Sequence, residues 1–342
     1  MSTATPPDAK TRNRVQALIA GAWGTQVIHV AARLEVFDRL LDGPRAAADL
    51  AAATSSNPGA FLRLMRGLAS LDLVKHLEGD RFELTAAGEL LAAQAPGSIR
   101  GMALHWGERL WGAMGQLDQS VQTGKAWRAS GLDGFQQMAH DPAQMAMFHQ
   151  SMTDQTGPVA AEMLKVYDFS RFKTLMDVGG SYGALLAAIL SAHPDLKGRV
   201  FDLPDLAQAS EAYLEVAGVG DRAEFEGGSF FKSVPADADA YMLKMIIHDW
   251  DDEHAIPILA NCAKAAGADG VVLVMERIAP ERVGPDPADH ITIRGDLIML
   301  TAAGGLERTE AEYRALFARS GLKIRSITPT ASGFAIMETA AA

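Results

Sequence analysis

The sequence is poor in cysteine, with Cys262 as the single one among 342 residues. One thiol cannot form an internal disulfide, so no disulfide framework holds this fold, and a reducing compartment fits. Long apolar runs are also lacking, because no stretch approaches the ~20 consecutive apolar residues that span a bilayer. The first ten residues, MSTATPPDAK, lack the basic start and apolar run of a signal peptide. We therefore expect a cytoplasmic protein that does not enter the membrane.

An excess of basic residues is absent as well. The chain has 31 Lys and Arg against 42 Asp and Glu, a net charge of −11. Repulsion at long range makes such a chain a poor general binder of nucleic acid or anionic membrane, and we expect neither partner. The His, Cys and carboxylate residues show no metal-ligand spacing, so no metal is expected. The length predicts two domains or one with additions, and 48% hydrophobic residues provide ample core.

The first hundred residues have the order of a winged helix. Apolar residues at helical spacing predict a helix over 11–42. Asn57 is the expected N-cap, with Pro58 in the first turn, of the second of two further helices. These helices and the two short strands that follow span 46–53, 58–71, 73–77 and 81–85. We predict a mostly helical, winged-helix-like domain over residues 1–100.

The usual role of a winged helix is to bind DNA, and the second helix argues against it here. Arg63 and Arg66 are its charged residues, and its remaining surface is apolar nearly all round. A helix that reads a DNA groove needs an exposed basic face, so this one is expected in its own core or against a partner subunit. A winged-helix regulator that senses a ligand is the alternative from another class of function.

Residues 101–168 are expected to be helical and to connect the two domains. They are rich in methionine and tryptophan, and flexible thioethers line sites that accept irregular apolar ligands. Most of these side chains are expected in helix cores. We predict that the segment also forms a lid over an acceptor pocket.

From residue 169 to 342 strands alternate with helices, which predicts an α/β domain with a parallel sheet. The last two strands are joined by a short Ala-Ser-Gly turn and must therefore pair antiparallel. A parallel sheet with such a hairpin is the arrangement of class I methyltransferases. The expected strands are 174–180, 198–204, 238–250, 270–278, 322–330 and 333–340, and the expected helices are 184–194, 251–267 and 309–321.

A glycine turn follows the first of these strands. Asp177 precedes Gly179 and Gly180, and Val178 breaks the G-x-G-x-x-G pattern that binds pyrophosphate. A dehydrogenase is therefore disfavoured, and a cofactor without phosphates, such as S-adenosylmethionine, is favoured over a turn without function. Asp202 ends the next strand, where an acid can accept hydrogen bonds from a ribose diol or can cap a helix.

His248 lies at the end of the third strand, where open α/β sheets place ligands. A histidine there can take a proton near neutral pH. Glu276 and Glu307 are candidates to flank it, since carboxylates fix an imidazole tautomer and stabilise the imidazolium. Helix capping is the alternative explanation of Asp249 and Glu307.

These motifs together resemble the plant-type small-molecule O-methyltransferases, a family that includes caffeate and acetylserotonin enzymes and bacterial tailoring enzymes. The resemblance covers almost the whole chain through LMDVGGSYG, VFDLPD, KMIIHDWDDEH, VMERI and DLIMLTAAGGLERT. It implies S-adenosylmethionine as cofactor, S-adenosylhomocysteine as product and a homodimer. The implied residues are His248 as general base with Glu276, Glu307 and Asp249 beside it; Asp177, Gly179, Gly180, Asp202, Leu203 and Lys244 around the cofactor; and Phe148, Met152 and Met299 lining the acceptor pocket.

The chain departs from the plant members at three positions. Ser229 and Phe230 stand where plant members usually have Asp-Met, so Ser229 would accept a hydrogen bond from the adenine and Phe230 would stack on it. Gln155 stands where some plant enzymes have histidine. We therefore expect an acceptor that differs from their phenylpropanoids.

The sequence thus predicts an O-methyltransferase of secondary metabolism that methylates a hydroxyl, expected to be phenolic, of a small apolar or aromatic metabolite. A histidine of pKa ~6.5 is weak against a phenol of pKa ~10, so concerted proton removal is expected. A nitrogen or carbon methyltransferase of the same fold, or a relative that no longer methylates, stays an alternative. The sequence does not identify the acceptor or the position methylated.

Overall fold

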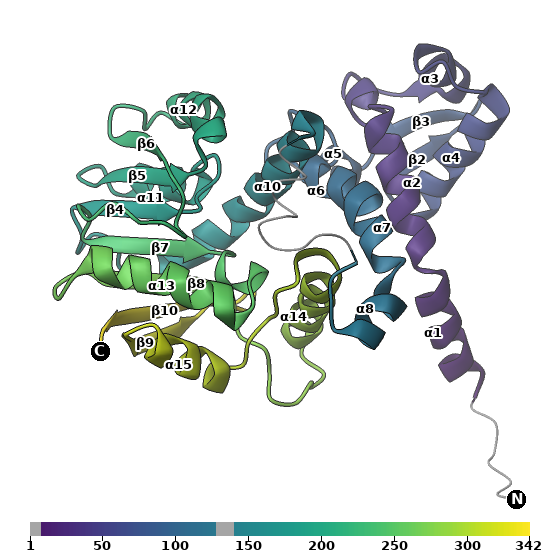
Figure 1. The fold of residues 1–342 in the computed structure, drawn as a ribbon. Coiled ribbons are helices and arrows are strands. Elements are labelled where there is room, and N and C mark those ends of the chain that lie inside the picture. The colour runs from purple at the N-terminus through teal and green to yellow at the C-terminus, as the bar shows by residue number, and fades with distance from the viewer. Residues whose placement is uncertain (1–7, 128–139) are drawn as a thin grey trace, which may run out of the picture. The chain divides into compact units, whose positions relative to one another are not determined.

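The computed structural model describes residues 8–127 and 140–342 (Figure 1). It consists of two compact units. The first comprises Met1–Trp111 and Gln150–Asp154, and the second comprises Gly112–His149 and Gln155–Ala342. Each unit is described by itself below.

The first unit is mostly helical, with a small antiparallel sheet in the order β1-β3-β2. The predicted order of two helices and a hairpin is confirmed in α3, α4, β2 and β3. The elements are α1 (Ala9–Ala20), α2 (Ala22–Arg33), η1 (Asp38–Leu40), β1 (Arg45–Ala46), α3 (Ala47–Ala53), α4 (Pro58–Ser70), β2 (Val74–Leu77), β3 (Arg81–Leu84), α5 (Ala86–Glu89), α6 (Arg100–His105) and η2 (Trp106–Leu110).

Helix α4 begins as its sequence predicts. The Asn57 side chain accepts a hydrogen bond from the Ala60 amide at 3.0 Å, and Pro58 occupies the first turn. Phe61, Met65 and Leu68, spaced by three or four residues, are buried in the core of the unit. The apolar face of α4 is therefore occupied by its own domain, as expected.

The prediction of one helix over 11–42 is wrong. The chain forms two helices separated at Gly21, and the second ends at Arg33. Glu35 then adopts a left-handed backbone conformation with a φ of 54°, which a continuing helix excludes. The turn brings Val36 and Phe37 into the core, where both side chains are fully buried.

Ala9–Arg33 is long and apolar enough to cross a membrane by length and composition alone, although polar residues interrupt it. This is weak evidence, because other apolar helices near an amino terminus pass the same test. The region is poorly covered within this chain: Leu18 and Ile19 on α1 are 72% and 77% exposed. Its apolar surface is therefore available to a partner.

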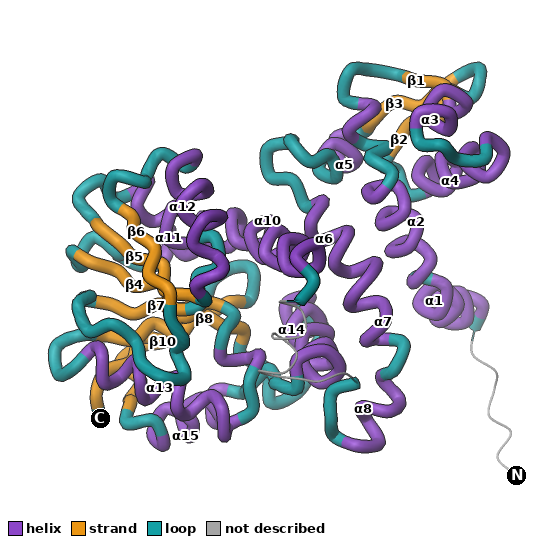
Figure 2. The backbone as a smooth tube through the Cα atoms, turned by 45° about the horizontal axis from the view of Figure 1, so that its top comes forward, coloured by secondary structure: helices purple, strands orange, loops and turns teal. Residues whose placement is uncertain are grey.

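The second unit contains a seven-stranded sheet with helices on both faces (Figure 2). Helix α7 lies at the boundary, and α10 has its central residues in the first unit. The elements are α7 (Trp111–Met114), α8 (Leu117–Thr123), α10 (Pro142–Val166), β4 (Thr174–Val178), α11 (Ala184–Ala192), β5 (Lys197–Asp202), η3 (Pro204–Leu206), α12 (Ala207–Val216), β6 (Ala223–Gly227), β7 (Ala240–Lys244), η4 (Ile247–Asp249), α13 (Asp252–Ala266), β8 (Val271–Arg277), α14 (Pro287–Ile298), η5 (Met299–Ala303), α15 (Glu310–Arg319), β9 (Leu322–Pro329) and β10 (Phe334–Ala341).

The sheet has the order β6-β5-β4-β7-β8-β10-β9. The neighbouring strands β6, β5, β4, β7 and β8 are parallel, whereas β10 is antiparallel to both β8 and β9. The predicted class I methyltransferase architecture with its terminal hairpin is confirmed. Since β4 pairs with β5 on one side and β7 on the other, the strand order reverses there. Ligands of such sheets bind beyond the carboxyl ends of the strands at this switch point.

Successive side chains of each strand point to opposite faces of the sheet, so the hydrophobic core has two layers. On β8, Leu273 and Met275 face one cluster, which includes buried residues of α10 and α11. Val272 and Val274 face the other, which includes buried residues of α13 and α15. Burial of both faces explains why these strands read as continuous apolar runs.

The third strand is shorter than its predicted span of 238–250. It ends at Lys244, and Met245 then adopts a φ of 56°, which turns the chain out of the sheet. The short η4 helix follows and carries His248. The apolar run through this region conceals the turn, because periodicity cannot separate a buried strand from a short buried helix.

Candidate active site

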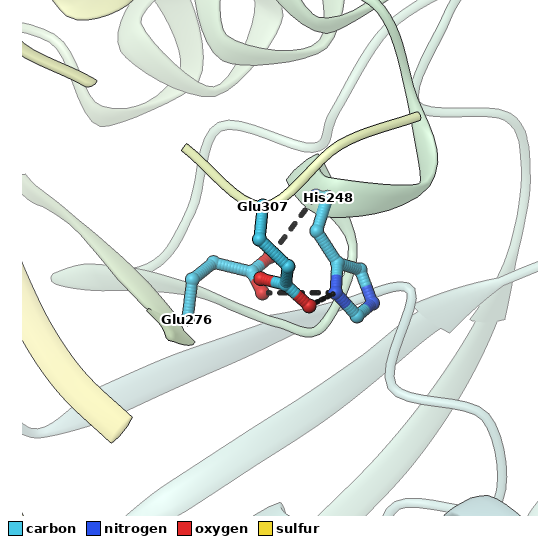
Figure 3. Close-up of side chains that lie close together, drawn as sticks. All are labelled: His248, Glu276 and Glu307. Atoms are coloured by element: carbon cyan, nitrogen blue, oxygen red, sulfur yellow. Dashed lines mark hydrogen bonds and ion pairs between the residues drawn. The ribbon is translucent and has the colours of Figure 1, made fainter. Parts of the chain in front are cut away.

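His248 is buried beyond the carboxyl end of β7, and the carboxylates of Glu276 and Glu307 both lie beside one nitrogen of its ring (Figure 3). Its Nδ1 atom lies 2.9 Å from Oε1 of Glu307 and 3.8 Å from Oε2 of Glu276. Its Nε2 atom lies 3.7 Å from Oδ1 of Asp249. The glutamates thus contact one nitrogen of the ring and leave the other for a further partner.

Glu276 is fully buried and holds the backbone that carries His248. Its Oε1 atom accepts hydrogen bonds from the amides of Ile246 and Ile247, both at 2.9 Å, and from that of His248 at 3.4 Å. The register of β7 and β8 pairs Lys244 with Met275, which places Glu276 directly beside this turn. The carboxylate therefore orients the histidine through the main chain as well as facing its ring.

Glu307 reaches the ring from the segment before α15. The Leu306 amide donates to the His248 carbonyl at 2.9 Å, and the Glu307 amide donates to Oδ1 of Asp296 at 3.0 Å. A Cβ atom at Gly305 would lie 2.0 Å from the His248 carbonyl oxygen, so glycine is required there. Main-chain pairing thus fixes Glu307 beside His248, which capping alone would not explain.

Arg308 is a positioning residue that the sequence analysis missed. Its guanidinium is buried and donates to the carbonyls of Ile247 at 3.1 Å and Trp250 at 2.8 Å, and to Oδ1 of Asp252 at 3.0 Å. It holds the carbonyls of the turn around His248, whereas Glu276 holds its amides. The sequence feature that could have identified Arg308 is its place directly after Glu307, a candidate catalytic acid.

The acids alter the proton affinity of His248. Burial lowers the pKa of the imidazole, but the carboxylates of Glu276 and Glu307 outweigh burial and raise it to about 10. Burial raises the pKa of Glu276 to about 7, against the opposing effect of the imidazolium. The expectation of an ordinary histidine near ~6.5 is therefore wrong, because the acids raise the pKa of His248. Burial also raises the pKa of Asp249 to about 6, again opposed by His248.

The glycine loop after β4 has the conformations that its composition predicts. Gly179 and Gly183 have φ values of 73° and 84°, and Ser181 between them has 57°. A Cβ atom at Gly179 would lie 2.5 Å from the Ile246 side chain, so the loop approaches the turn that leads to His248. A Cβ atom at Gly180 would lie 2.7 Å from the carboxylate of Asp177.

Asp202, at the end of β5, holds this loop in place. Its two oxygens accept hydrogen bonds from the amides of Ser181 at 2.8 Å and Leu203 at 2.7 Å. A carboxylate oxygen can accept more than one hydrogen bond, so both keep capacity for ribose hydroxyls. Burial raises the pKa of this carboxyl. Asp202 thus has a structural role at the position expected for a ribose ligand.

Asp177, which is buried, and Lys244, which is partly buried, are two further ionisable side chains close to this loop, and each affects the pKa of the other. Burial raises the pKa of Asp177 to about 7 although Lys244 opposes it, and burial lowers the pKa of Lys244 to about 8 although Asp177 opposes it. The Oδ2 atom of Asp177 has no hydrogen-bond partner among the described residues. A buried acceptor beside a tight glycine turn fits a ligand with a positively charged end, as S-adenosylmethionine has.

Ser229 and Phe230 lie in the turn after β6. The Phe230 carbonyl accepts a hydrogen bond from the Asn261 side-chain amide at 2.8 Å. The centroid of the Phe230 ring lies 6.2 Å from that of Trp250. A Cβ atom at Gly179 would lie 3.6 Å from the Phe230 ring, so this aromatic borders the glycine loop. Leu203, 43% exposed, directly follows β5. The adenine contacts stay a prediction.

The candidate acceptor residues come from two helices. Phe148, Met152 and Gln155 share one face of α10 by their spacing of four and three residues, with Met152 in the first unit. Met299 begins η5, which contacts η4. Their role in lining a pocket stays a prediction.

The ligand atoms of His248, Glu276 and Glu307 lie within 4.8 Å of one another, which a metal ion could span. The contact between Nδ1 and Glu307 already uses two of the atoms that a metal would need. The other ring nitrogen is turned away from both acids. The set therefore suits an imidazole held by carboxylates.

Comparison with known proteins identifies both parts of the chain. Residues 114–323 match the O-methyltransferase domain, and residues 16–94 match the O-methyltransferase dimerisation domain. Phenazine O-methyltransferase from Lysobacter antibioticus is 39% identical over 323 residues, 94% of each chain. The chain belongs to the S-adenosylmethionine-dependent O-methyltransferase family. It carries that family's dimerisation domain and forms a homodimer.

Two further similarities define the range of this family. An O-methyltransferase from neocarzinostatin biosynthesis, solved with S-adenosylmethionine and 2-hydroxy-5-methyl naphthoic acid, has a TM-score of 0.76 and 33% identity, covering 93% of this chain and 96% of that one. The 8-amino-8-demethylriboflavin N,N-dimethyltransferase of Streptomyces davaonensis is 32% identical, covering 91% of this chain and 90% of its own. O-methyltransferase relatives thus share their fold with an enzyme that methylates nitrogen.

Proposed function

We propose that this O-methyltransferase methylates a phenolic hydroxyl of a small aromatic metabolite, with His248 as the general base. The observation that carries the proposal is the arrangement of His248 with Glu276 and Glu307. It lies beyond the carboxyl end of β7, one strand from the glycine loop, where ligands of such sheets bind. The phenazine and naphthoic acid in the names of similar proteins support an aromatic acceptor.

His248 removes the proton of the acceptor hydroxyl through Nε2. Because Nδ1 donates its hydrogen to Glu307, the neutral ring has a lone pair on Nε2. S-adenosylmethionine supplies a methyl group on a sulfonium that leaves as a neutral thioether. As the new carbon–oxygen bond forms, the hydroxyl proton passes to Nε2, and the two glutamates stabilise the imidazolium. A pKa raised to about 10 matches the base to a phenol of pKa ~10.

Binding of the cofactor is assigned to the carboxyl ends of β4, β5 and β7. Asp202 would accept the ribose hydroxyls, while Asp177 and Lys244 complement the charges of the amino-acid end. Ser229 and Phe230 would contact the adenine. Phe148, Met152, Gln155 and Met299 would line the acceptor pocket, with Asp249 near the reacting oxygen.

A nitrogen acceptor is the second candidate, favoured by the similarity to the riboflavin N,N-dimethyltransferase. An aromatic amine attacks with its own lone pair and needs no base before the bond forms. A hydroxyl gains more from an imidazole whose pKa two acids raise, and for this reason we favour oxygen. We also propose that the enzyme acts in the cytoplasm, since the lone cysteine fits a reducing compartment.

The test is methyl transfer from radiolabelled S-adenosylmethionine to paired acceptors, each a phenol and the aniline of the same ring system. We expect product from phenols, and a fall of about 10²–10⁴ in turnover for His248→Gln. Calorimetric titration should show that the variant still binds S-adenosylhomocysteine like the parent. Near-normal turnover of the variant on a phenol would contradict the assignment of the base. Transfer to anilines alone would favour the nitrogen acceptor.

A further inference from the structure

A buried histidine outside the catalytic group lies against the glycine loop. His149, on α10 within the second unit, is 6% exposed. Its Nδ1 atom lies 2.6 Å from Oγ of Ser181, the central residue of the loop. Its ring centroid lies 5.3 Å from that of Tyr182, the next residue of the loop. The proposed function gives His149 no role.

The contact stabilises an unfavourable backbone conformation. Ser181 has a φ of 57°, which residues other than glycine rarely adopt. Its amide donates to Asp202, and its hydroxyl contacts His149. Two side chains from separate elements thus hold one strained residue, and with it the position of the loop between Gly179 and Gly183.

The other ring nitrogen of His149 has no partner among the described residues, although it is buried. The Ser181 hydroxyl has Nδ1 of His149 as its hydrogen-bond partner. If the hydroxyl donates to Nδ1, the neutral ring carries its hydrogen on Nε2. Burial keeps the ring neutral by lowering the pKa of His149 to about 4. The result is a buried N–H donor that needs an acceptor.

We propose that Nε2 of His149 donates a hydrogen bond to the α-carboxylate of bound S-adenosylmethionine, with Ser181 fixing the ring. This inference rests on the proposed cofactor site. A buried N–H donor without a partner fits an anionic oxygen of the ligand, which yields a charge-assisted hydrogen bond. Asp177, whose free oxygen lies beneath the same loop, complements the ammonium at the same end of the molecule. His149 is accordingly a cofactor-binding residue that selects for the complete amino-acid end.

The experiment compares two ligands by calorimetric titration. One is S-adenosylhomocysteine, and the other is its decarboxylated analogue, which keeps the adenosine, the sulfur and the amine. His149→Asn retains an amide at the position of Nδ1 for Ser181 but has no group at the position of Nε2. We expect this variant to bind S-adenosylhomocysteine about 10- to 100-fold more weakly and to bind the analogue as the parent does.

A matched control is His193→Asn, at the end of α11 in the same unit and outside the proposed site. It should bind both ligands like the parent. Equal weakening of both ligands by His149→Asn would overturn the proposal and leave His149 as a support of the loop alone. Unchanged binding of both would overturn it as well. If the parent fails to bind S-adenosylhomocysteine, the proposed cofactor site itself fails, which separates that outcome from the others.

Discussion

At the scale of single residues, the proton affinity of His248 depends on the charges of the two acids beside it. Three buried ionisable side chains, His248, Glu276 and Glu307, face one another. Burial alone would make the imidazole a weaker base, and the two acids reverse the effect. The base is stronger than a free histidine, and it must lose its own proton before it can act.

The rate should therefore rise with pH over an unusual range. A base works in its deprotonated form, and the pKa of His248 is raised to about 10. We expect kcat/KM to increase with pH from neutrality toward about 10, where an ordinary histidine would level off above ~6.5. Two acceptors whose hydroxyl pKa values differ should give the same rising limb, which separates the enzyme's titration from the substrate's.

Glu307→Gln tests the cause of this shift. The amide oxygen can still accept from Nδ1, but the negative charge is lost, so the pKa of His248 should fall. The rising limb of the kcat/KM profile should move to lower pH, and the maximal rate should decrease. A profile that stays in place would show that Glu307 orients the ring without raising its pKa.

His248 and Glu276 could be predicted because strand ends converge in a parallel sheet, whereas Glu307, which lies before α15, was predicted from its motif. Arg308, Asp296 and His149 could not, because their partners are main-chain atoms, a carboxylate or a serine hydroxyl from distant parts of the chain. No spacing in the sequence marks such contacts. The cofactor and acceptor residues expected from the resemblance stay predictions.

At the scale of elements, one turn determines whether the site forms. The segment from Met245 to Trp250 leaves β7, and it is held by Glu276 of β8 and by Arg308 before α15. The sequence predicted a strand through this turn, since its apolar run matches a buried strand equally well. Strand β6, with its alternating glutamates, lacks the apolar signal of the other strands and was missed. The domain limits at residues 100 and 168 stay predictions.

Arg308→Lys should weaken this turn. Lysine keeps the charge but lacks the planar fork that reaches Ile247, Trp250 and Asp252 together. A buried carbonyl left without its donor costs about 1–3 kcal/mol, so the free energy of unfolding in urea should fall by that amount and kcat should fall with it.

Arg314→Lys is the matched control for this substitution. Arg314 pairs with Glu310 on the exposed surface of α15, where an ion pair contributes about 0.3–0.5 kcal/mol. We expect little change in stability or rate. Equal effects of the two substitutions would mean that Arg308 does not hold the turn.

At the scale of the whole molecule, the exposed apolar residues of α1 need a covering. The dimerisation-domain match begins at residue 16 and includes Leu18 and Ile19, which are 72% and 77% exposed. A partner subunit removes such side chains from water.

The double substitution Leu18→Asp with Ile19→Asp should produce a monomer by light scattering at micromolar concentration, where the parent is a dimer. Val216→Asp changes an apolar residue of α12 that is 89% exposed in the other unit, and it should leave the dimer intact. If the double variant still sedimented as a dimer, the partner surface would lie elsewhere on the first unit.

Cys262 on α13 gives the chain one further property. The thiol is fully buried, and burial raises its pKa to about 12, so it does not ionise at neutral pH. A maleimide reagent should not react with Cys262 in the folded enzyme, and it should react when the catalytic domain unfolds. The wild-type chain therefore contains its own unfolding probe, and a cysteine introduced on the surface could carry a fluorophore without background labelling.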